Sequence, residues 1–134
     1  MKIYGSGTDI IRVERVKKII KSNKKFKNKI FSKSEIKLCE RRKNNYSCFA
    51  SRFAAKEAFS KSLGTGISKG LSFKEIEIKN DKNGKPFVKV TGKSLKILYK
   101  TIKNKKFKIF LSISDDKPFA IAFVILTILW KKAL

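Results

Sequence analysis

The spacing of the apolar residues constrains the fold of this 134-residue chain more than any other feature of its sequence. From Tyr46 to Ala54 they recur every three or four positions, which is the period of one face of an α-helix. The segment as far as Leu63 is rich in Ala, Lys and Glu, and Gly64 is placed to end it. The sequence therefore predicts a helix from Tyr46 to Leu63.

Later segments have the period of two that is typical of strands. Residues 71–78 and 86–91 flank an Asn-Asp-Lys-Asn-Gly turn and predict a β-hairpin. Residues 107–113 alternate up to a turn at 115–118, and the apolar run from Phe119 predicts a buried strand that pairs back. With the helix, these segments predict an α+β fold with an antiparallel sheet and packed helices.

The amino-terminal region predicts a strand followed by a helix. A short strand at Ile3–Tyr4, broken by Gly5 and Gly7, precedes apolar residues at helical spacing from Ile10 to Ile20. Lysines and arginines lie between these apolar residues, so the predicted helix has a cationic outer face.

Two further helices are predicted. Ser32 and Glu35 have the spacing of a capping box, so a short helix should run from there through Cys39. A second follows from the apolar positions within residues 95–102. No repeat, linker or shift in composition divides the sequence, and residues 1–134 are expected to form a single domain.

The charge of the chain is strongly positive. It has 34 Lys and Arg against 10 Asp and Glu, a formal net charge of +24. Such a field favours polyanionic partners, among them nucleic acid, anionic lipid and acidic proteins. Because Lys, Ile, Asn and Phe are all plentiful, background amino-acid usage explains the charge equally well.

Composition also excludes several kinds of chemistry. The chain has no histidine, which removes imidazole acid-base catalysis and every His-containing zinc site. Cys39 and Cys48 are too far apart for a CxxC pair, and each is expected to be a small apolar or surface residue in a reducing cytoplasm. The start lacks the features of a secretory signal, and the apolar run from Phe119 to Trp130 is too short for a membrane-spanning helix.

Two of the few carboxylates have unusual positions. Asp9 follows a glycine-rich strand end, and Glu57 lies on the apolar side of the central helix, so together they could hold Mg²⁺ against substrate phosphates. Lys61, one turn beyond Glu57, could neutralise a phosphate oxygen. Spacing alone favours simpler interpretations: Asp9 N-caps the first helix, Glu57 pairs with Lys61, an isolated Lys61 is a solvated surface charge, and Gly64 is a plain C-cap.

Three motifs together resemble the holo-[acyl-carrier-protein] synthase family, in order and spacing, over nearly the whole chain. They are Gly7-Thr-Asp-Ile10, the long segment Arg52-Phe-Ala-Ala-Lys-Glu-Ala-Phe-Ser-Lys-Ser-Leu-Gly-Thr-Gly-Ile67, and Asn83-Gly-Lys-Pro86. The resemblance implies a small phosphopantetheinyl transferase fold. It also implies Mg²⁺-dependent transfer of 4′-phosphopantetheine from coenzyme A to a serine of apo-acyl carrier protein, giving holo-carrier and adenosine 3′,5′-bisphosphate for fatty acid biosynthesis.

The resemblance also assigns roles to residues. Asp9 and Glu57 match the Mg²⁺ ligands, Glu57 helps to deprotonate the serine, and Lys61 stabilises charge on the phosphate. Lys61, Gly64, Thr65 and Gly66 match positions that bind coenzyme A, and Arg15, Lys18 and Lys21 lie on the surface that receives the acidic carrier. The family further implies a homotrimer with active sites between subunits.

This sequence departs from the family in two places. Phe110 and Asp115 stand where many members have histidine, and the tail from Trp130 to Leu134 extends beyond the usual end. A basic nucleic-acid-binding module is the rival interpretation. Against it, phenylalanines such as Phe49 and Phe53 fall at core-facing positions instead of interleaving with lysines, so neither nucleic acid nor membrane is an expected partner.

Overall fold

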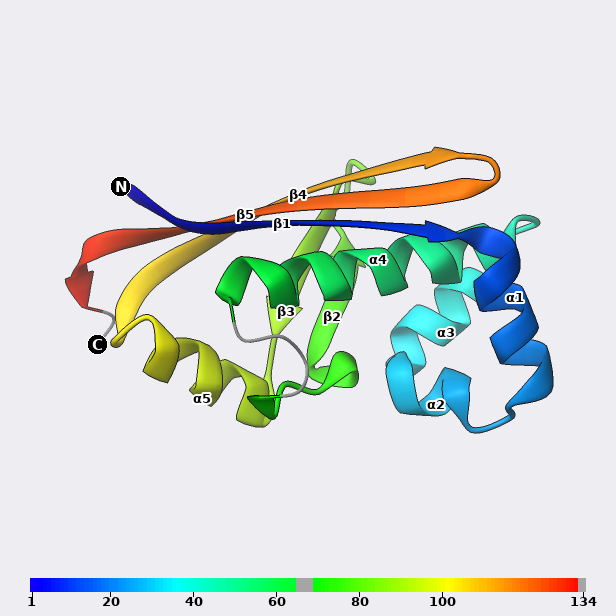
Figure 1. Ribbon diagram of the computed structural model, residues 1–134, viewed down its shortest axis with the longest axis horizontal. Coiled ribbons are helices and arrows are strands. Elements are labelled where there is room, and N and C mark those ends of the chain that lie inside the picture. Colours follow the sequence, from blue (N-terminus) through cyan, green and yellow to red (C-terminus); the bar gives the residue numbers. More distant parts are fainter. Residues whose placement is uncertain (65–68, 133–134) are drawn as a thin grey trace.

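A long helix packs against one face of a three-stranded antiparallel sheet, and the other helices lie on that same side (Figure 1). The computed structural model describes residues 1–64 and 69–132. A separate two-stranded sheet crosses beside the long helix. The elements are β1 (Lys2–Arg12), α1 (Val13–Ser22), α2 (Phe26–Ile30), α3 (Lys33–Glu40), α4 (Asn45–Leu63), the 3-10 helix η2 (Phe73–Glu75), β2 (Ile76–Asn80), β3 (Pro86–Val90), α5 (Gly92–Thr101), β4 (Lys105–Asp116) and β5 (Phe119–Lys132).

The predicted α+β class and the central helix are confirmed. Helix α4 begins at Asn45 and ends at Leu63, and Gly64 closes it in the left-handed conformation, with φ of 83°. The strand order of the larger sheet is β1-β5-β4, so the last strand of the chain lies at its centre. Covering of one face of β5 by α4 accounts for every second apolar residue of the run from Phe119, namely the fully buried Ala120, Ala122, Val124 and Leu126.

The amino-terminal prediction was wrong about where the strand ends. β1 continues through Gly5 and Gly7 to Arg12, with one shift of its register on β5 between Ile3 and Gly5, and α1 begins only at Val13. Ile10, assigned to the helix by its spacing, pairs with Ile121 of β5. Ladder pairing with a distant strand therefore outweighs the local helical period.

The two glycines of β1 are needed for the approach of α4. A Cβ atom on Gly7 would overlap the carbonyl oxygen of Ala58, and one on Gly5 would overlap that of Ser62. Their lack of a side chain lets the helix backbone contact the strand directly. This contact sets the distance between the side chains of β1 and those of the last turns of α4.

The two predicted hairpins are confirmed, with one local difference. β2 pairs with β3 from Ile76 opposite Val90 to Asn80 opposite Pro86, and β4 pairs with β5 up to Asp116 opposite Phe119. The alternation expected from residue 71 does not form strand before Ile76, because Phe73–Glu75 makes a 3-10 turn. Helix α5 confirms the prediction for residues 95–102.

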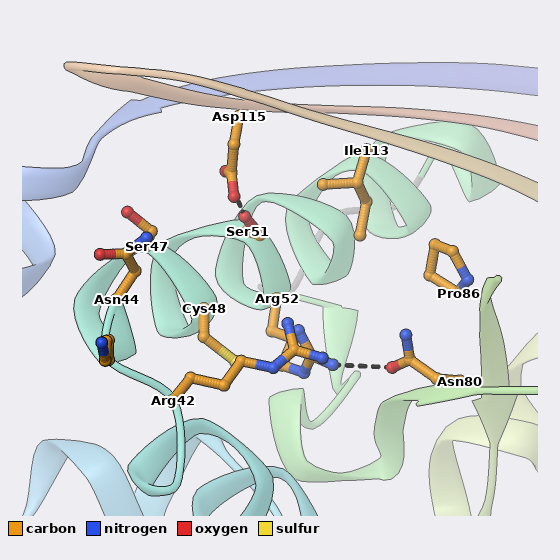
Figure 2. A pocket seen from close by; sticks show the side chains of 11 residues that line it. Arg42, Asn44, Ser47, Cys48, Ser51, Arg52, Asn80, Pro86, Ile113 and Asp115 are labelled. Carbon is orange, nitrogen blue, oxygen red and sulfur yellow. Dashed lines mark hydrogen bonds between the residues drawn. The ribbon is translucent and has the colours of Figure 1, made fainter. Parts of the chain in front are cut away.

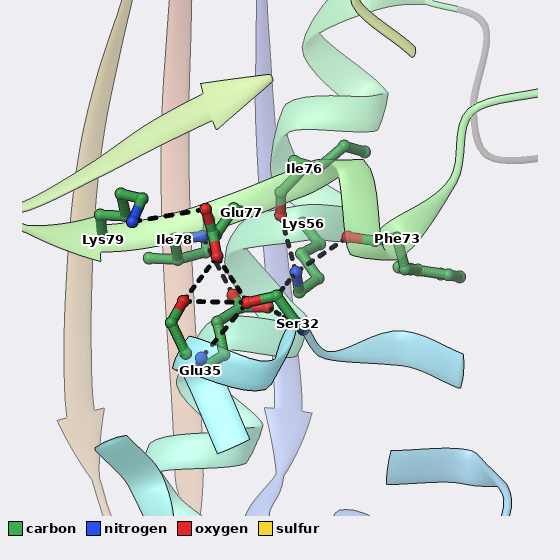
Figure 3. Close-up of polar contacts among 9 residues, drawn as sticks. Ser32, Glu35, Lys56, Phe73, Ile76, Glu77, Ile78 and Lys79 are labelled. Atoms are coloured by element: carbon green, nitrogen blue, oxygen red, sulfur yellow. Dashed lines mark hydrogen bonds and ion pairs between the residues drawn. The ribbon is translucent and has the colours of Figure 1, made fainter. Parts of the chain in front are cut away.

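Helix α3 confirms the capping box of Ser32 and Glu35. Glu35 has a second role that the sequence did not reveal, because it forms a fully buried ion pair with Lys56 of α4 at 2.8 Å (Figure 3). The Lys56 ammonium also donates to the carbonyl oxygens of Phe73 and Ile76, at 2.8 and 2.7 Å. Lys56 therefore joins α3, α4 and β2 inside the protein and does not face a site.

The expectation that Cys39 and Cys48 act as separate thiols was wrong. They form a disulfide between the end of α3 and the first turn of α4, with Cα atoms 5.4 Å apart. The intervening residues 41–44 reverse the chain, which brings together two positions nine residues apart. Sequence spacing could not show this, since the proximity depends on how α3 packs on α4.

Candidate active site

Asp9 and the last turns of α4 form a small charged cluster. Asp9 lies on β1 with its side chain 17% exposed, and the Lys61 ammonium donates to its Oδ1 at 3.2 Å and to the Thr8 carbonyl oxygen at 2.8 Å. These contacts decide between the two interpretations of Asp9 and between those of Lys61. Asp9 is within a strand and does not cap α1, and Lys61 pairs with Asp9 across elements.

Glu57 belongs to the same cluster through its electrostatics. Burial raises the pKa of Glu57, and the negative charge of Asp9 raises it further, against the opposing charge of Lys61. Burial likewise raises the pKa of Asp9, although Lys61 and Arg15 act in the other direction. Two half-buried carboxylates that repel each other are stabilised when a cation lies between them.

The donor set of this cluster fits Mg²⁺. That ion prefers hard oxygen ligands and is commonly held by one or two carboxylates, with the other positions left to water and substrate phosphates. Within residues 1–64 and 69–132 no group of three or more His, Cys, Asp and Glu side chains comes together. Asp9 and Glu57 are hard oxygen donors of the kind that this ion prefers, so the residues present fit it, and their role as its ligands stays a prediction.

The glycine-rich segment after α4 is only partly described. Gly64 ends the helix in a left-handed conformation, as its C-cap interpretation requires. Thr65 and Gly66, predicted to bind coenzyme A with Lys61 and Gly64, lie outside the described residues. Their role, and that of Gly64 in binding, stays a prediction.

A basic pocket of about 450 Å³ lies beside the first half of α4 (Figure 2). Its cations are Arg42 and Lys43 from the α3–α4 loop and Arg52 from α4. Arg52 is 4% exposed and donates to Asn80 Oδ1 at 2.8 Å, while its Nε has no partner among the described residues. Burial, and then the charge of Arg42, lower the pKa of Arg52, so an anion entering here would relieve that repulsion.

Asp115 also faces this pocket, and Phe110 does not line it. Ser51 donates to Asp115 Oδ1 at 2.6 Å, as Figure 2 shows, so the carboxylate is held at the edge of the basic group. Phe110 is 47% exposed and lies on the opposite face of β4. The two departures from the family pattern thus have different surroundings.

The pocket residues were mostly missed by sequence reasoning. Arg42 and Lys43 sit in a lysine-rich stretch where no single cation stands out. Asn80 and Pro86 come from the predicted hairpin turn, and only the fold brings that turn to α4. The Asn83-Gly-Lys-Pro86 motif was the one available signal.

Arg15, Lys18 and Lys21 all lie exposed on α1, as their predicted docking role requires. Arg15 is close enough to Asp9 for its charge to act on that carboxyl group. Lys21 lies over the ring of Tyr46, 5.9 Å from its centroid, and Lys17 lies over the same ring at 5.6 Å. The cationic face of α1 therefore adjoins the carboxylate cluster.

Two neighbouring carboxylates, an adjacent lysine and a basic pocket on an α+β scaffold are typical of an enzyme that acts on phosphate esters. A family model agrees with this class. The chain belongs to the 4′-phosphopantetheinyl transferase superfamily, whose model matches residues 5–124. The resemblance inferred from the three motifs is thereby confirmed.

Relatives match almost the whole chain. A holo-[acyl-carrier-protein] synthase of Pelagibacter ubique is 49% identical over 126 residues, covering 94% of this chain and 98% of its own length. The crystal structure of the Neisseria meningitidis synthase has a TM-score of 0.82 at 34% identity and covers 93% of this chain and 98% of that chain. The Bacillus anthracis synthase, solved in complex with CoA (3′,5′-ADP), has a TM-score of 0.77 at 37% identity over 94% and 97%.

Proposed function

We propose that this chain is a holo-[acyl-carrier-protein] synthase. It transfers 4′-phosphopantetheine from coenzyme A to a serine of apo-acyl carrier protein, and releases adenosine 3′,5′-bisphosphate. The observation that carries the proposal is the half-buried pair Asp9 and Glu57 beside Lys61, in a chain that is 49% identical to a protein of that name. The product, holo-carrier, serves fatty acid biosynthesis in the cytoplasm, and residues 1–134 act as one domain.

Asp9 and Glu57 would hold the Mg²⁺ ion. Bound there, the ion supplies positive charge against the pyrophosphate of coenzyme A. The mutual repulsion of the two carboxylates in their half-buried setting favours its uptake. Glu57 and Lys61 are then the residues closest to the chemistry.

Glu57 acts as the base toward the serine hydroxyl, directly or through one water. A general base must lie within reach of the proton that it takes, and the electrostatic influence of Asp9 and Lys61 on Glu57 shows that its carboxylate lies near them. Lys61 already has its ammonium between Thr8 and Asp9 and offers its remaining donor to the phosphate that becomes the leaving group. Both residues stabilise charge that develops as the phosphorus–oxygen bonds exchange.

The basic pocket suits the nucleotide end of coenzyme A. That end carries phosphate groups, and the pocket offers the guanidinium of Arg42, the ammonium of Lys43 and the unpartnered Nε of Arg52. The segment with Gly64, Thr65 and Gly66 offers backbone amides to the pyrophosphate. The Bacillus anthracis relative was solved with CoA, which supports the choice of ligand.

The acyl carrier protein docks on α1. Arg15, Lys18 and Lys21 present exposed positive charge next to the carboxylate cluster. An acidic carrier is steered toward such a surface, and its serine arrives beside Glu57. The net charge of +24 extends this field over the whole molecule.

A homotrimer with active sites between subunits is part of the proposal. The face of the larger sheet that α4 leaves uncovered carries large apolar side chains: Ile10 at 56%, Phe110 at 47% and Phe123 at 41% exposed. Apolar side chains grouped on one face are typical of a surface that another subunit covers. Each subunit would then supply part of a neighbour's site.

A nucleic-acid-binding module is not favoured by the packing of the aromatic residues. Phe49 is 1% exposed, and Phe53 stacks on Phe73 with centroids 5.4 Å apart within the protein. Phe53, Phe73 and Phe107 all pack against the core. Stacking with bases needs exposed rings, so these side chains do not provide it.

The test is intact-mass analysis of an apo-acyl carrier protein incubated with this protein and coenzyme A. We expect a gain of one phosphopantetheine group with Mg²⁺ and no gain with a chelator. The same assay without the protein is the control. Absence of a gain with several different carriers would contradict the proposal.

A further inference from the structure

The disulfide between Cys39 and Cys48 holds one wall of the basic pocket. Residues 41–44, which lie between the two cysteines, form the α3–α4 loop, and Arg42, Lys43 and Asn44 of this loop line the pocket. Cys48 lines it as well, and Figure 2 shows its side chain among the others. The bond therefore fixes both ends of the loop that supplies two of the three pocket cations.

The loop is electrostatically unfavourable where it lies. Arg41, Arg42 and Lys43 are three successive cations, and Arg42 is close enough to lower the pKa of the buried Arg52. Residues 41–43 are exposed and Arg52 is buried, so without a bound anion the unfavourable interaction is that of Arg42 with Arg52, and an outward movement of the loop would relieve it. The covalent link opposes that movement because it restricts where residues 41–44 can go.

We propose that the redox state of the Cys39–Cys48 pair regulates the affinity of this pocket for a phosphate-bearing ligand. In the oxidised protein the loop is preorganised and the ligand binds tightly. In the reduced protein the loop occupies other positions, and part of the binding free energy is used to bring it back. The inference rests on the proposed function, which makes the nucleotide end of coenzyme A the ligand.

Reduction requires a dithiol, either small or of the protein type. Its thiolate attacks the Cys48 sulfur, since Cys48 lines the pocket and Cys39 is 0% exposed. The bond between the two cysteine sulfurs breaks, a mixed disulfide forms on Cys48, and Cys39 leaves as a thiolate that takes up a proton. The second thiol of the dithiol then releases Cys48, so two electrons pass to the protein and the dithiol becomes a disulfide.

A reciprocal effect follows from the same geometry. If oxidation strengthens ligand binding, the bound ligand must favour the oxidised protein by the same factor. The ligand also occupies the pocket through which a thiolate reaches Cys48. Bound ligand should therefore slow the reduction of the disulfide as well as make it less favourable.

The first experiment measures the affinity of adenosine 3′,5′-bisphosphate for oxidised and reduced protein by calorimetry, with the redox state checked by intact mass. We expect binding to weaken about tenfold on reduction, as for a loop that forms the pocket about one-tenth of the time. The variant Cys39→Ser/Cys48→Ser should bind like reduced protein and should not respond to dithiothreitol. This variant separates loss of the bond from other effects of the reductant.

Each other outcome has a distinct meaning. Equal affinity in the two redox states would overturn the regulatory role and leave the proposed function standing. No binding in either state would show that the pocket does not take the nucleotide, and both proposals would fail there. As a second readout, saturating adenosine 3′,5′-bisphosphate should slow the reduction of the disulfide by dithiothreitol, and an unchanged rate would also count against the switch.

Discussion

Glu57 is the proposed base, and its negative charge is unfavourable in the structure because it is partly buried and repelled by Asp9. Glu57→Gln removes the charge at nearly constant volume. We expect transfer of phosphopantetheine to fall about 10²- to 10⁴-fold, as for loss of a positioned base. The free energy of unfolding should not fall, since the repulsion from Asp9 is relieved.

The measurement is turnover by intact mass together with urea denaturation. Glu40→Gln is the matched control, because Glu40 is exposed and its ion pair with Lys27 lies on the surface. That variant should keep its turnover. Turnover of Glu57→Gln at the wild-type rate would contradict the role of Glu57.

Lys56 belongs to the same Arg52–Ile67 motif as Glu57, but its role is structural. Both partners of its ion pair with Glu35 are 0% exposed, so removal of one leaves an uncompensated buried charge. Lys56→Met should lower the free energy of unfolding by about 3–5 kcal/mol. Urea denaturation of the purified protein measures this loss.

The double variant Lys56→Met/Glu35→Leu tests the cause. Replacing both charges with apolar groups removes the penalty of the unpaired Glu35, so the double variant should be more stable than Lys56→Met alone. If the double variant is instead less stable, loss of the hydrogen bonds that Glu35 accepts from the backbone of Ser32 and Ile78 outweighs the relief of its unpaired charge.

At the scale of elements, the contact between β1 and α4 determines the geometry of the site. Gly7→Ala would place a methyl group where the Ala58 carbonyl lies, and the helix would have to shift. We expect a loss of stability of about 1–3 kcal/mol and a larger loss of Mg²⁺-dependent transfer, because Asp9 and Glu57 move apart. Unfolding and turnover, measured on the same preparation, check both effects.

Gly84→Ala is the control for this variant. Gly84 has φ of 83° and nothing within 4 Å of a Cβ placed on it, so the substitution strains the hairpin turn away from Asp9 and Glu57, although the Gly84 carbonyl oxygen accepts from Asn80 of the basic pocket. It should cost about 1 kcal/mol of stability and, at saturating coenzyme A, leave transfer per folded molecule unchanged. Equal losses of transfer in the two glycine variants would contradict the importance of the β1–α4 contact.

At the scale of the whole molecule, the proposed capture of an acidic carrier by the positive field can be tested by reversing charges. Lys18→Glu/Lys21→Glu reverses two exposed charges of α1. We expect KM for the carrier to rise while kcat changes little, and the effect of added salt on KM to become weaker than in the wild type. Steady-state kinetics over a range of salt concentrations measure both.

Lys96→Glu/Lys100→Glu makes the same change in net charge on α5, which lies at the other end of the molecule from α1 (Figure 1). If net charge alone attracts the carrier, this control will raise KM as much as the α1 variant does. If α1 is the docking surface, its effect will be the smaller one.

Much of the fold was predictable because it depends on local patterns. The helical period of α4 and its terminal Gly64, the capping box of Ser32 and Glu35, and the alternation of β4 with its return strand each arise from neighbours in sequence. The resemblance of three motifs gave the family, and with it Asp9, Glu57 and Lys61 as candidates. The motifs were sufficient to indicate these candidates because few arrangements combine two carboxylates and a lysine in this order and spacing.

Other features were decided only by the tertiary structure. Pairing with β5 extends β1 through two glycines that the sequence pattern predicts as a break, and the packing of α3 on α4 joins Cys39 to Cys48. Lys61 reaches Asp9 across elements, and the basic pocket combines a loop, a helix and a hairpin turn. The physical reason is the same in each case: the partner is far away in sequence, so no local period or propensity records it. The sequence by itself determined most of the elements, their charge and the family, and packing determined where β1 ends and which side chains meet.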